Sequence, residues 1–242
     1  MIGKEFIEKT KYPNLEPSLQ SQGVPLPDLQ VPAPEGAQMI KLPDGKSLKL
    51  DAQDFIRLVD RRETLRNYSD KPLSLEELVY LLWGTQGVKS VTDKPVSKRT
   101  VPSAGSRHAF ETYLLVNRVD GLPPGLYRYM ALEHQLARLD VSEKISDILT
   151  EACLNQPHVK NSAVTFFWAA VPLRMVWRYC QRGYRYMYLD AGHVCQNLYL
   201  LAESIHCGVC AIAAYDDDLV NQALGLDGED QFAIYIATLG KR

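Results

Sequence analysis

Residues 61–78 of this chain read RRETLRNYSDKPLSLEEL, and the second half of this stretch marks the start of a helix. Ser74 and Glu77 form a capping box, in which the hydroxyl and the carboxylate accept hydrogen bonds from N–H groups that a helix start leaves unpaired. Leu78 and Leu81 follow at the spacing of a buried helix face. The stretch therefore predicts a helix that begins at Ser74 and packs on a core.

The first half of the same stretch carries two arginines and a threonine. In a helical turn, Arg62 and Arg66 would share one face, with Thr64 at its edge. Two guanidinium groups and a hydroxyl could then converge on an anionic ligand. The alternative is a pair of solvated surface arginines, and the spacing by itself leaves both interpretations open.

Upstream of this stretch the chain is rich in proline. Half of its 14 prolines lie within the first 43 residues. Proline fixes φ and removes the N–H donor, which excludes regular helix and central strand there. We expect residues 1–50 to form an extended arm, laid over the domain or over a partner subunit, and residues 51–242 to form the folded domain. A floppy tail is the alternative.

Downstream, short runs of β-branched, aromatic and aliphatic residues predict core strands. These runs are Thr112–Val116, Val164–Trp168, Ala211–Tyr215 and Ala233–Ala237. Between the second and third, we expect a helix that Asp190 caps and that ends near Gly208. Residues 125–139 fit a small surface hairpin.

The composition of the chain excludes several classes of function. With 27 Lys+Arg against 29 Asp+Glu, the net charge of -2 argues against a nucleic acid or an anionic membrane as partner. The N-terminus lacks a signal-peptide core and no apolar run is long enough to span a bilayer, which predicts a cytoplasmic protein. The five cysteines are odd in number and predict reduced thiols. No dinucleotide fingerprint, P-loop or metal motif occurs, and Cys207 and Cys210 are expected to be buried and inert, not redox-active.

Three further stretches accompany the arginine pair: Pro102–Ser106, Asp190–Leu200 and the basic end Gly240–Arg242. This set, in this order, resembles the FMN-dependent nitroreductase superfamily, and within it the SagB-type dehydrogenases related to azoline oxidases. The resemblance covers residues 55–242. It implies an α+β, nitroreductase-like fold, with a mostly antiparallel sheet flanked by helices. It also implies an intertwined homodimer with FMN at two interface sites.

The resemblance also implies roles for individual residues. Arg62 would lie on the flavin phosphate and ribityl chain, Thr64 close by, and Arg66 at the pyrimidine edge, where a cation stabilises the reduced ring. The remaining cofactor contacts would come from a loop that often reaches the flavin from the other subunit, a backbone N–H at flavin N5, and a phosphate-binding lysine. In this chain these are Pro102, Ser103, Ala104 and Gly105, then Ala213 and Ala214, and finally Lys241. Each group has an alternative interpretation. The loop could be a common turn, the alanines could belong to a plain core strand, and the lysine could lie in a frayed charged tail.

Arg178 and Tyr179 stand where azoline oxidases carry a catalytic Lys-Tyr pair. A guanidinium stays protonated and cannot accept a proton as lysine can, so azole formation by that route is not expected. Tyr179 could instead donate a proton to a substrate, and Arg178 could orient an anionic one. The alternative is an exposed helix or lid with interleaved Arg and Tyr.

The sequence thus predicts an FMN-dependent oxidoreductase that moves hydride through flavin N5. The donor would be NAD(P)H or an organic compound, and the acceptor a small molecule. Two other functions stay open: a dehydrogenase of azoline-oxidase type acting on a peptide or small molecule, and a flavin-binding scaffold without its own catalysis.

Overall fold

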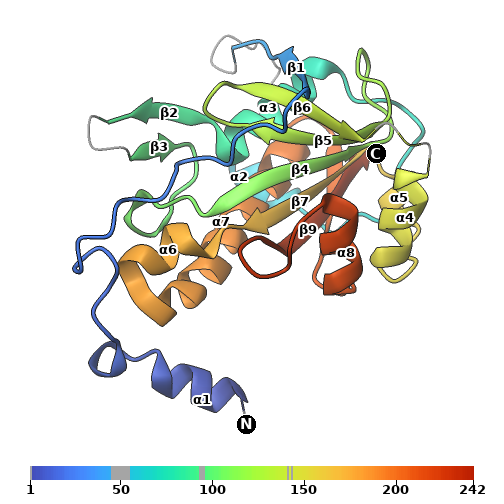
Figure 1. Ribbon diagram of the computed structural model, residues 1–242. Helices are drawn as coiled ribbons and strands as arrows, with labels where there is room; N and C mark the ends of the chain where they lie inside the picture. Colours follow the sequence, from blue (N-terminus) through green and yellow to red (C-terminus); the bar gives the residue numbers. More distant parts are fainter. Residues whose placement is uncertain (1, 45–54, 93–95, 141, 143) are drawn as a thin grey trace.

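The computed structural model describes residues 2–44, 55–92, 96–140, 142 and 144–242. The expected boundary between arm and domain, at residues 50 and 51, lies outside these ranges. The chain forms a central sheet with helices on both faces, and the N-terminal arm runs along one side (Figure 1).

Seven strands form the central sheet in the order β1-β6-β5-β4-β7-β9-β8, and every neighbouring pair is antiparallel. The strands are β1 Gln38–Lys41, β4 Phe110–Val116, β5 Gly125–Met130, β6 Gln135–Asp140, β7 Val164–Ala170, β8 Cys207–Ile212 and β9 Phe232–Lys241. A separate two-stranded ribbon pairs β2 Val88–Val91 with β3 Ser97–Arg99. The predicted α+β fold with an antiparallel sheet is confirmed.

Helices cover both faces of the sheet and bury a core on each. The helices are α1 Ile2–Lys9, α2 Phe55–Arg61, α3 Leu75–Gln86, α4 Ile145–Ala152, α5 His158–Asn161, α6 Pro172–Tyr179, α7 Gly183–Ser204 and α8 Asp217–Leu224. Three short 3-10 turns join them: η1 Tyr12–Asn14, η2 Ala104–Ser106 and η3 Cys180–Arg182. One core holds side chains of α3 and α7, and the other holds those of α4 and α8. The predicted helix start is confirmed, because Ser74 caps α3 and Glu77 completes the capping box.

Two predictions about the long helix were wrong. Helix α7 begins at Gly183, so Asp190 lies in its interior and does not cap it. Asp190 is buried, and its carboxylate accepts a hydrogen bond from the backbone of Ala104, a tertiary contact that a capping rule cannot foresee. The helix also ends at Ser204, before Gly208, which belongs to β8.

Two further predictions were wrong in the β region. Strand β8 is Cys207–Ile212, so residues 213–215 of the expected strand Ala211–Tyr215 lie beyond it. The chain turns away because Asp216 caps α8 with its side chain. The expected surface hairpin is the β5–β6 pair, but β5 is buried throughout because it is an interior strand whose two faces pack into the two cores.

The proline-rich arm lies over the body of its own chain (Figure 1). It starts from α1, passes α6, and joins the sheet where β1 pairs with β6. Along the way Gln30 donates to Glu133, and Val31 donates its N–H to Glu111. The arm is therefore attached to the body of its own chain between residues 10 and 43. The prediction that the first 43 residues contain no regular helix was wrong for Ile2–Lys9, which form α1 because they precede the first proline, Pro13.

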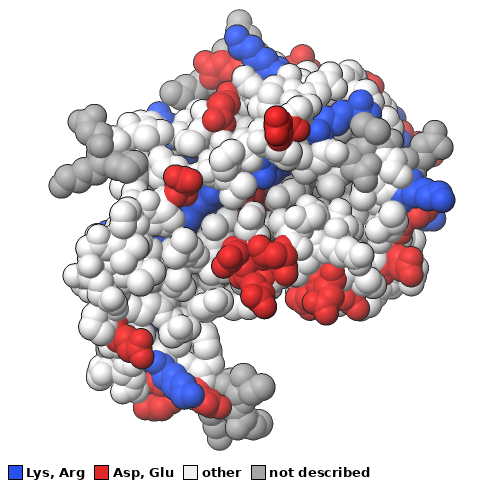
Figure 2. All heavy atoms as spheres, viewed as in Figure 1, with Lys and Arg blue, Asp and Glu red and all other residues white. Residues whose placement is uncertain are grey.

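On the face shown in Figure 2, basic side chains are scattered and form no continuous positive surface. Carboxylates gather on this face over the lower end of α8 and the loop before β9 (Figure 2). Among the described helices, none has the length and apolar character needed to cross a bilayer.

Candidate functional site

The first group of candidate residues lies along β8, which is the last strand of the sheet and has one open edge. Residues 62–66 run beside this edge. Leu65 donates its N–H to the carbonyl of Val209 at 2.9 Å, and Thr64 forms a parallel bridge with the same residue. Gly208 permits this approach, since a Cβ there would lie 2.4 Å from the Leu65 side chain.

The expected helical turn around Arg62 and Arg66 was wrong. Helix α2 ends at Arg61, and the following residues are extended because their backbone pairs with the β8 edge. In extended chain, residues two apart point to the same side. Arg62 and Thr64 accordingly meet the same partner, Tyr199 of α7. The Arg62 guanidinium lies 5.5 Å from its ring centroid, and Thr64 Oγ1 lies 3.3 Å from its hydroxyl oxygen.

Tyr199 ties this group to the strand. Its hydroxyl accepts a hydrogen bond from the N–H of Ala211 at 3.0 Å. Arg66 hydrogen-bonds Cys210, whose pKa is raised by burial and pulled back partly by that guanidinium. We call Arg62, Thr64, Arg66, Tyr199 and Ala211 the strand-edge cluster. Sequence reasoning missed Tyr199, because an aromatic residue at helical spacing looks like ordinary core.

Ala213 and Ala214 follow the end of this strand and are exposed. The N–H of Ala211 points to the open edge, away from β9, since it donates to Tyr199. Ala213 directly follows the last residue of β8, at the end of the strand where the chain leaves the sheet. The carbonyl of Ala214 accepts a hydrogen bond from Gln156 at 2.7 Å, which fixes the turn.

The basic chain end is ordered beside residues 62–69. Lys241 is the last residue of β9, its carbonyl accepts the N–H of Ser69 at 2.9 Å, and its ammonium pairs with Glu77. Arg242 pairs with Glu63 and Glu203, at 2.7 Å each. Carboxylates therefore hold both cations next to the strand-edge cluster.

The second group lies at the other end of α7. The carboxylate of Asp190 accepts the N–H of Ala104 at 3.3 Å, and Ser103 Oγ accepts the N–H of His108 at 2.9 Å. Gly105 has φ +54°, and a Cβ there would lie 2.4 Å from the Tyr179 hydroxyl. We call Ser103, Ala104, Gly105, Arg178 and Tyr179 the loop cluster; Pro102 precedes it.

The loop cluster has a positive electrostatic environment. Arg178 is exposed, and its guanidinium lies 5.6 Å from the centroid of the Tyr179 ring. The pKa of Arg107 is lowered, first by burial and then by the nearby charge of Arg178. Burial raises the pKa of Asp190, although hydrogen bonds from Ser103 and Ala104 oppose this. A negative or proton-accepting group would be stabilised beside Tyr179.

A single chain does not bring the two clusters together. Asp190, at the loop cluster, and Tyr199, in the strand-edge cluster, are nine positions apart on α7. Helical geometry places them about 14 Å apart along the axis and half a turn apart around it. The predicted site residues therefore form two groups on opposite sides of one helix.

The cysteines lie outside both clusters except for Cys210, whose thiol meets Arg66. All five are free thiols. Burial raises the pKa of Cys195 and of Cys207 to about 12, which keeps them protonated and unreactive at neutral pH. Among the described residues, no group of three or more His, Cys, Asp or Glu side chains is placed to hold a metal ion.

Comparison with known proteins agrees with this architecture. The model of the nitroreductase family matches residues 59–241, a range that contains every residue of both clusters. The chain belongs to the nitroreductase family. A relative from Methanocaldococcus jannaschii that carries the name nitroreductase is 31% identical over 203 residues, 84% of this chain and 96% of that protein.

Two other similarities involve a toxin-processing protein and a microcin synthetase. A trifolitoxin-processing protein of Rhizobium leguminosarum bv. trifolii is 28% identical over 134 residues, which are 54% of this chain and 36% of that protein. A chain of the E. coli microcin synthetase complex, solved with truncated pro-MccB17 bound, superposes on 100% of this chain and 92% of its own length. Its TM-score is 0.63 at 18% identity, which shows a shared fold.

The strand-edge cluster fits the flavin that this family typically binds. FMN presents a phosphate dianion and a ring whose N1, O2 and N5 atoms need hydrogen-bond donors. The cluster offers two guanidinium groups and a threonine hydroxyl beside the edge strand β8. These donors match the chemistry of FMN.

Proposed function

We propose that this member of the nitroreductase family is an FMN-dependent oxidoreductase that passes hydride between a nicotinamide or organic donor and a small-molecule acceptor. The observation that carries the proposal is the strand-edge cluster, where Arg62, Thr64 and Arg66 lie along the edge strand β8. Neither a catalytic metal group among the described residues nor a dinucleotide fingerprint offers a competing explanation.

Bound FMN would supply an atom, N5, that accepts and returns hydride. Arg62 would hold the phosphate and ribityl chain, with Thr64 close by and Lys241 as a second cation near the phosphate. Arg66 would stand at the pyrimidine edge, where a fixed cation favours negative charge on the ring. The backbone N–H groups at Ala213 and Ala214 would donate a hydrogen bond toward N5 and so orient the ring. Each group contributes by position and charge, with no covalent step of its own.

A homodimer completes this proposal. The outer face of α7 exposes Tyr188 and Leu189, at 61% and 62%, next to the exposed Gly192. Two copies of α7 that pair across this face would bring the loop cluster of each subunit toward the strand-edge cluster of its partner. A two-fold interface repeats each such contact, because the same surface is used on both subunits. Two complete sites would result.

Light scattering of the purified protein measures whether it is a homodimer. The expected mass in solution is twice the 27.3 kDa of one chain. A monomer that retains FMN tightly would contradict the shared site.

In such a dimer, the catalytic side chains proposed for the substrate are Arg178 and Tyr179. Tyr179 would donate a proton to the reduced acceptor, and Arg178 would orient an anionic substrate. Reduction of a substrate requires only a proton donor, which Tyr179 can be. Dehydrogenation requires a base, but Arg178 cannot accept a proton and Tyr179 would first have to lose its own.

The purified protein tests the cofactor. We expect it to be yellow and to release FMN, not FAD, on denaturation. Stopped-flow mixing with NADH or NADPH should bleach the flavin absorbance, and quinones or nitro compounds should restore it. Colourless protein that ignores added FMN would exclude the enzyme and favour a scaffold role.

A dehydrogenase of the SagB type, acting on a peptide or small molecule, is the second candidate. It is favoured by the similarity to a trifolitoxin-processing protein. The resemblance to azoline oxidases, which matches Tyr179 to their tyrosine, also supports it. Rapid bleaching of the flavin by an azoline peptide, with no bleaching by either nicotinamide, would select this function over the reductase.

A further inference from the structure

The N-terminal arm is attached to the helix that carries Tyr179. Four donors along α6 and η3 reach successive backbone carbonyls of the arm. These bonds run from Arg182 to Thr10 at 2.8 Å, from Cys180 to Glu16 at 3.0 Å, from Trp177 to Val24 at 2.8 Å, and from Arg174 to Asp28 at 2.9 Å. As the arm's residue numbers rise, those of its partners fall. The arm therefore runs antiparallel to this helical segment and follows it for its whole length.

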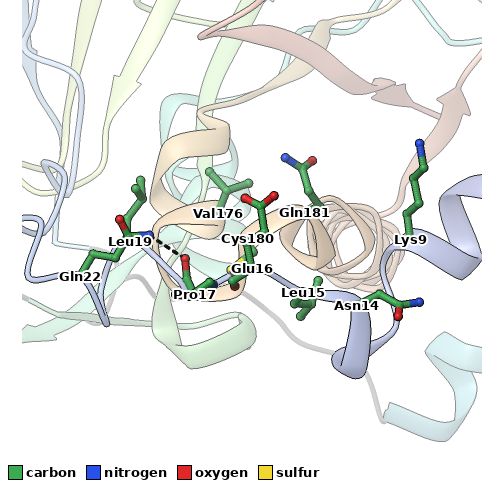
Figure 3. Close-up of a pocket in the computed structure, with 10 residues that line it drawn as sticks. All are labelled: Lys9, Asn14, Leu15, Glu16, Pro17, Leu19, Gln22, Val176, Cys180 and Gln181. Carbon is green, nitrogen blue, oxygen red and sulfur yellow. Dashed lines mark hydrogen bonds between the residues drawn. The ribbon is translucent and has the colours of Figure 1, made fainter.

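Hydrogen bonds, more than close packing, hold this part of the arm. A cavity of about 500 Å³ separates arm residues near Leu15 and Leu19 from Val176 and Gln181 (Figure 3). Because apolar contact is interrupted there, each hydrogen bond matters more to the position of the arm. The loss of one donor should loosen it measurably.

Trp177 is bonded to the arm twice. Its carbonyl accepts the N–H of Gln20 at 2.8 Å, and its indole Nε1 donates to the carbonyl of Val24 at 2.8 Å. The side chain is 8% exposed, so the indole N–H has little access to water as a substitute partner. Trp177 thus fixes α6 against the arm at both its backbone and its side chain.

The other contact of the indole leads to the loop cluster. The Arg107 guanidinium lies 5.3 Å from the centroid of the Trp177 ring, and Arg107 Nε donates to the carbonyl of Gly105 at 3.1 Å. Gly105 is the residue against which the Tyr179 hydroxyl packs. Arm, indole, guanidinium and glycine therefore form one continuous series of contacts that ends at the candidate proton donor.

We propose that Trp177 is a positioning residue, through which the N-terminal arm holds Tyr179 in register with the Pro102–Gly105 loop. Trp177 touches neither the strand-edge cluster nor the Tyr179 hydroxyl. It acts on the site through Arg107 on the loop side and through α6 on the tyrosine side. The arm is then part of the wall of the proposed substrate site. This inference rests on the proposed function, because it assigns Tyr179 to substrate.

The test compares Trp177→Phe with Trp83→Phe in the full-length protein. Phenylalanine keeps an aromatic ring under Arg107 but removes the N–H that reaches Val24. Trp83 is a matched control, since it lies on α3, where its ring packs edge-on against His134. The acceptor is menadione and the donor is NADH. Hydrogen exchange is measured over residues 15–32, 102–107 and 176–182 in both variants.

For Trp177→Phe we expect faster exchange in all three segments, FMN affinity within about twofold of the parent, and a rise of roughly fivefold in KM for menadione with kcat little changed. A KM effect of this kind indicates lost positioning of the substrate, which a general loss of stability would not produce. Trp83→Phe should leave the three segments and KM unchanged. Adding Gln20→Pro, which removes the other hydrogen bond, to Trp177→Phe should raise KM less than the sum of the single effects.

Faster exchange confined to residues 15–32, with residues 102–107 and KM unchanged, would overturn the coupling and leave the arm as a plain strap. Unchanged exchange everywhere would overturn the attachment itself. If the parent protein binds no FMN, the proposed function fails, but the exchange at residues 102–107 still decides whether Trp177 positions the loop.

Discussion

The strand-edge cluster and the loop cluster flank the same helix, yet they are built in different ways. The strand-edge cluster uses backbone pairing along β8, and its cations are held at the surface. The loop cluster is linked to buried charge, because Arg178 and Tyr179 share helix α6 with Arg174. Arg174 and Glu111, both 3% exposed, form an ion pair at 2.5 Å. Arg128 donates to the carbonyls of Val31 and Pro32 in the arm. We therefore expect the strand-edge cluster to keep its shape when one side chain is lost. The loop cluster should depend on the buried network of ion pairs and hydrogen bonds.

Among the variants considered, Glu111→Gln should cause the largest loss in the free energy of unfolding. Glutamine keeps the shape but removes the negative charge that faces Arg174 and Arg99, two cations that are almost completely buried. Breaking a buried ion pair in this way typically costs about 3–5 kcal/mol. Urea unfolding should show a loss of that size. The exposed pair of Asp147 and Lys160 gives a control, because Asp147→Asn should cost below about 1 kcal/mol.

Arg62→Ala addresses the strand-edge cluster and should affect binding more than folding. Loss of a charge-assisted contact with phosphate is worth about 1.5–3 kcal/mol, which is roughly tenfold or more in FMN affinity. Fluorescence titration with FMN measures this, and the urea midpoint should change little because the side chain is half-buried at the surface. A large loss of stability without a change in affinity would reverse the contrast between the clusters.

His108, whose N–H donates to Ser103 in the loop cluster, should make the stability of the fold depend on pH. Burial, together with the nearby charges of Arg99 and Arg107, lowers its pKa from 6.5 to about 3. As pH falls below 6.5, the unfolded chain takes up a proton that the folded chain refuses, so stability decreases until about pH 3. The expected loss between pH 6 and pH 4.5 is about 2 kcal/mol. His108→Gln should flatten this part of the stability profile, and an unchanged slope would refute the assignment.

Tyr199→Phe should have the smallest effect. It removes the hydroxyl that accepts the Ala211 N–H and contacts Thr64, but keeps the ring under Arg62. One neutral hydrogen bond is worth about 1 kcal/mol, so FMN affinity should fall by roughly fivefold at most. Tyr80→Phe, which loses a contact with Ser204 on the opposite side of α7, should leave FMN affinity unaltered.

Local signals in the sequence determined several features of this protein. The capping box set the start of α3, and runs of apolar residues located β4, β7 and β9, because these patterns act through neighbours in the chain. The resemblance to the nitroreductase superfamily, carried by motifs between residues 62 and 242, gave the fold class. The helix start and the strand positions depend on neighbours in the chain, whereas the fold class came from the order of the motifs.

Only the tertiary structure decided how the candidate residues group. Arg62 and Arg66 looked helical by spacing, but the unpaired edge of β8 offered their backbone a partner and drew it into extended form. Asp190 looked like a cap, but its carboxylate meets the Ala104 N–H from a loop 86 positions away in sequence. Tyr199 joins the site through hydrogen bonds to residues 135 and 12 positions away. Hydrogen-bond donors and acceptors are satisfied by whatever partner the fold brings near, and spacing along the chain carries no record of that partner.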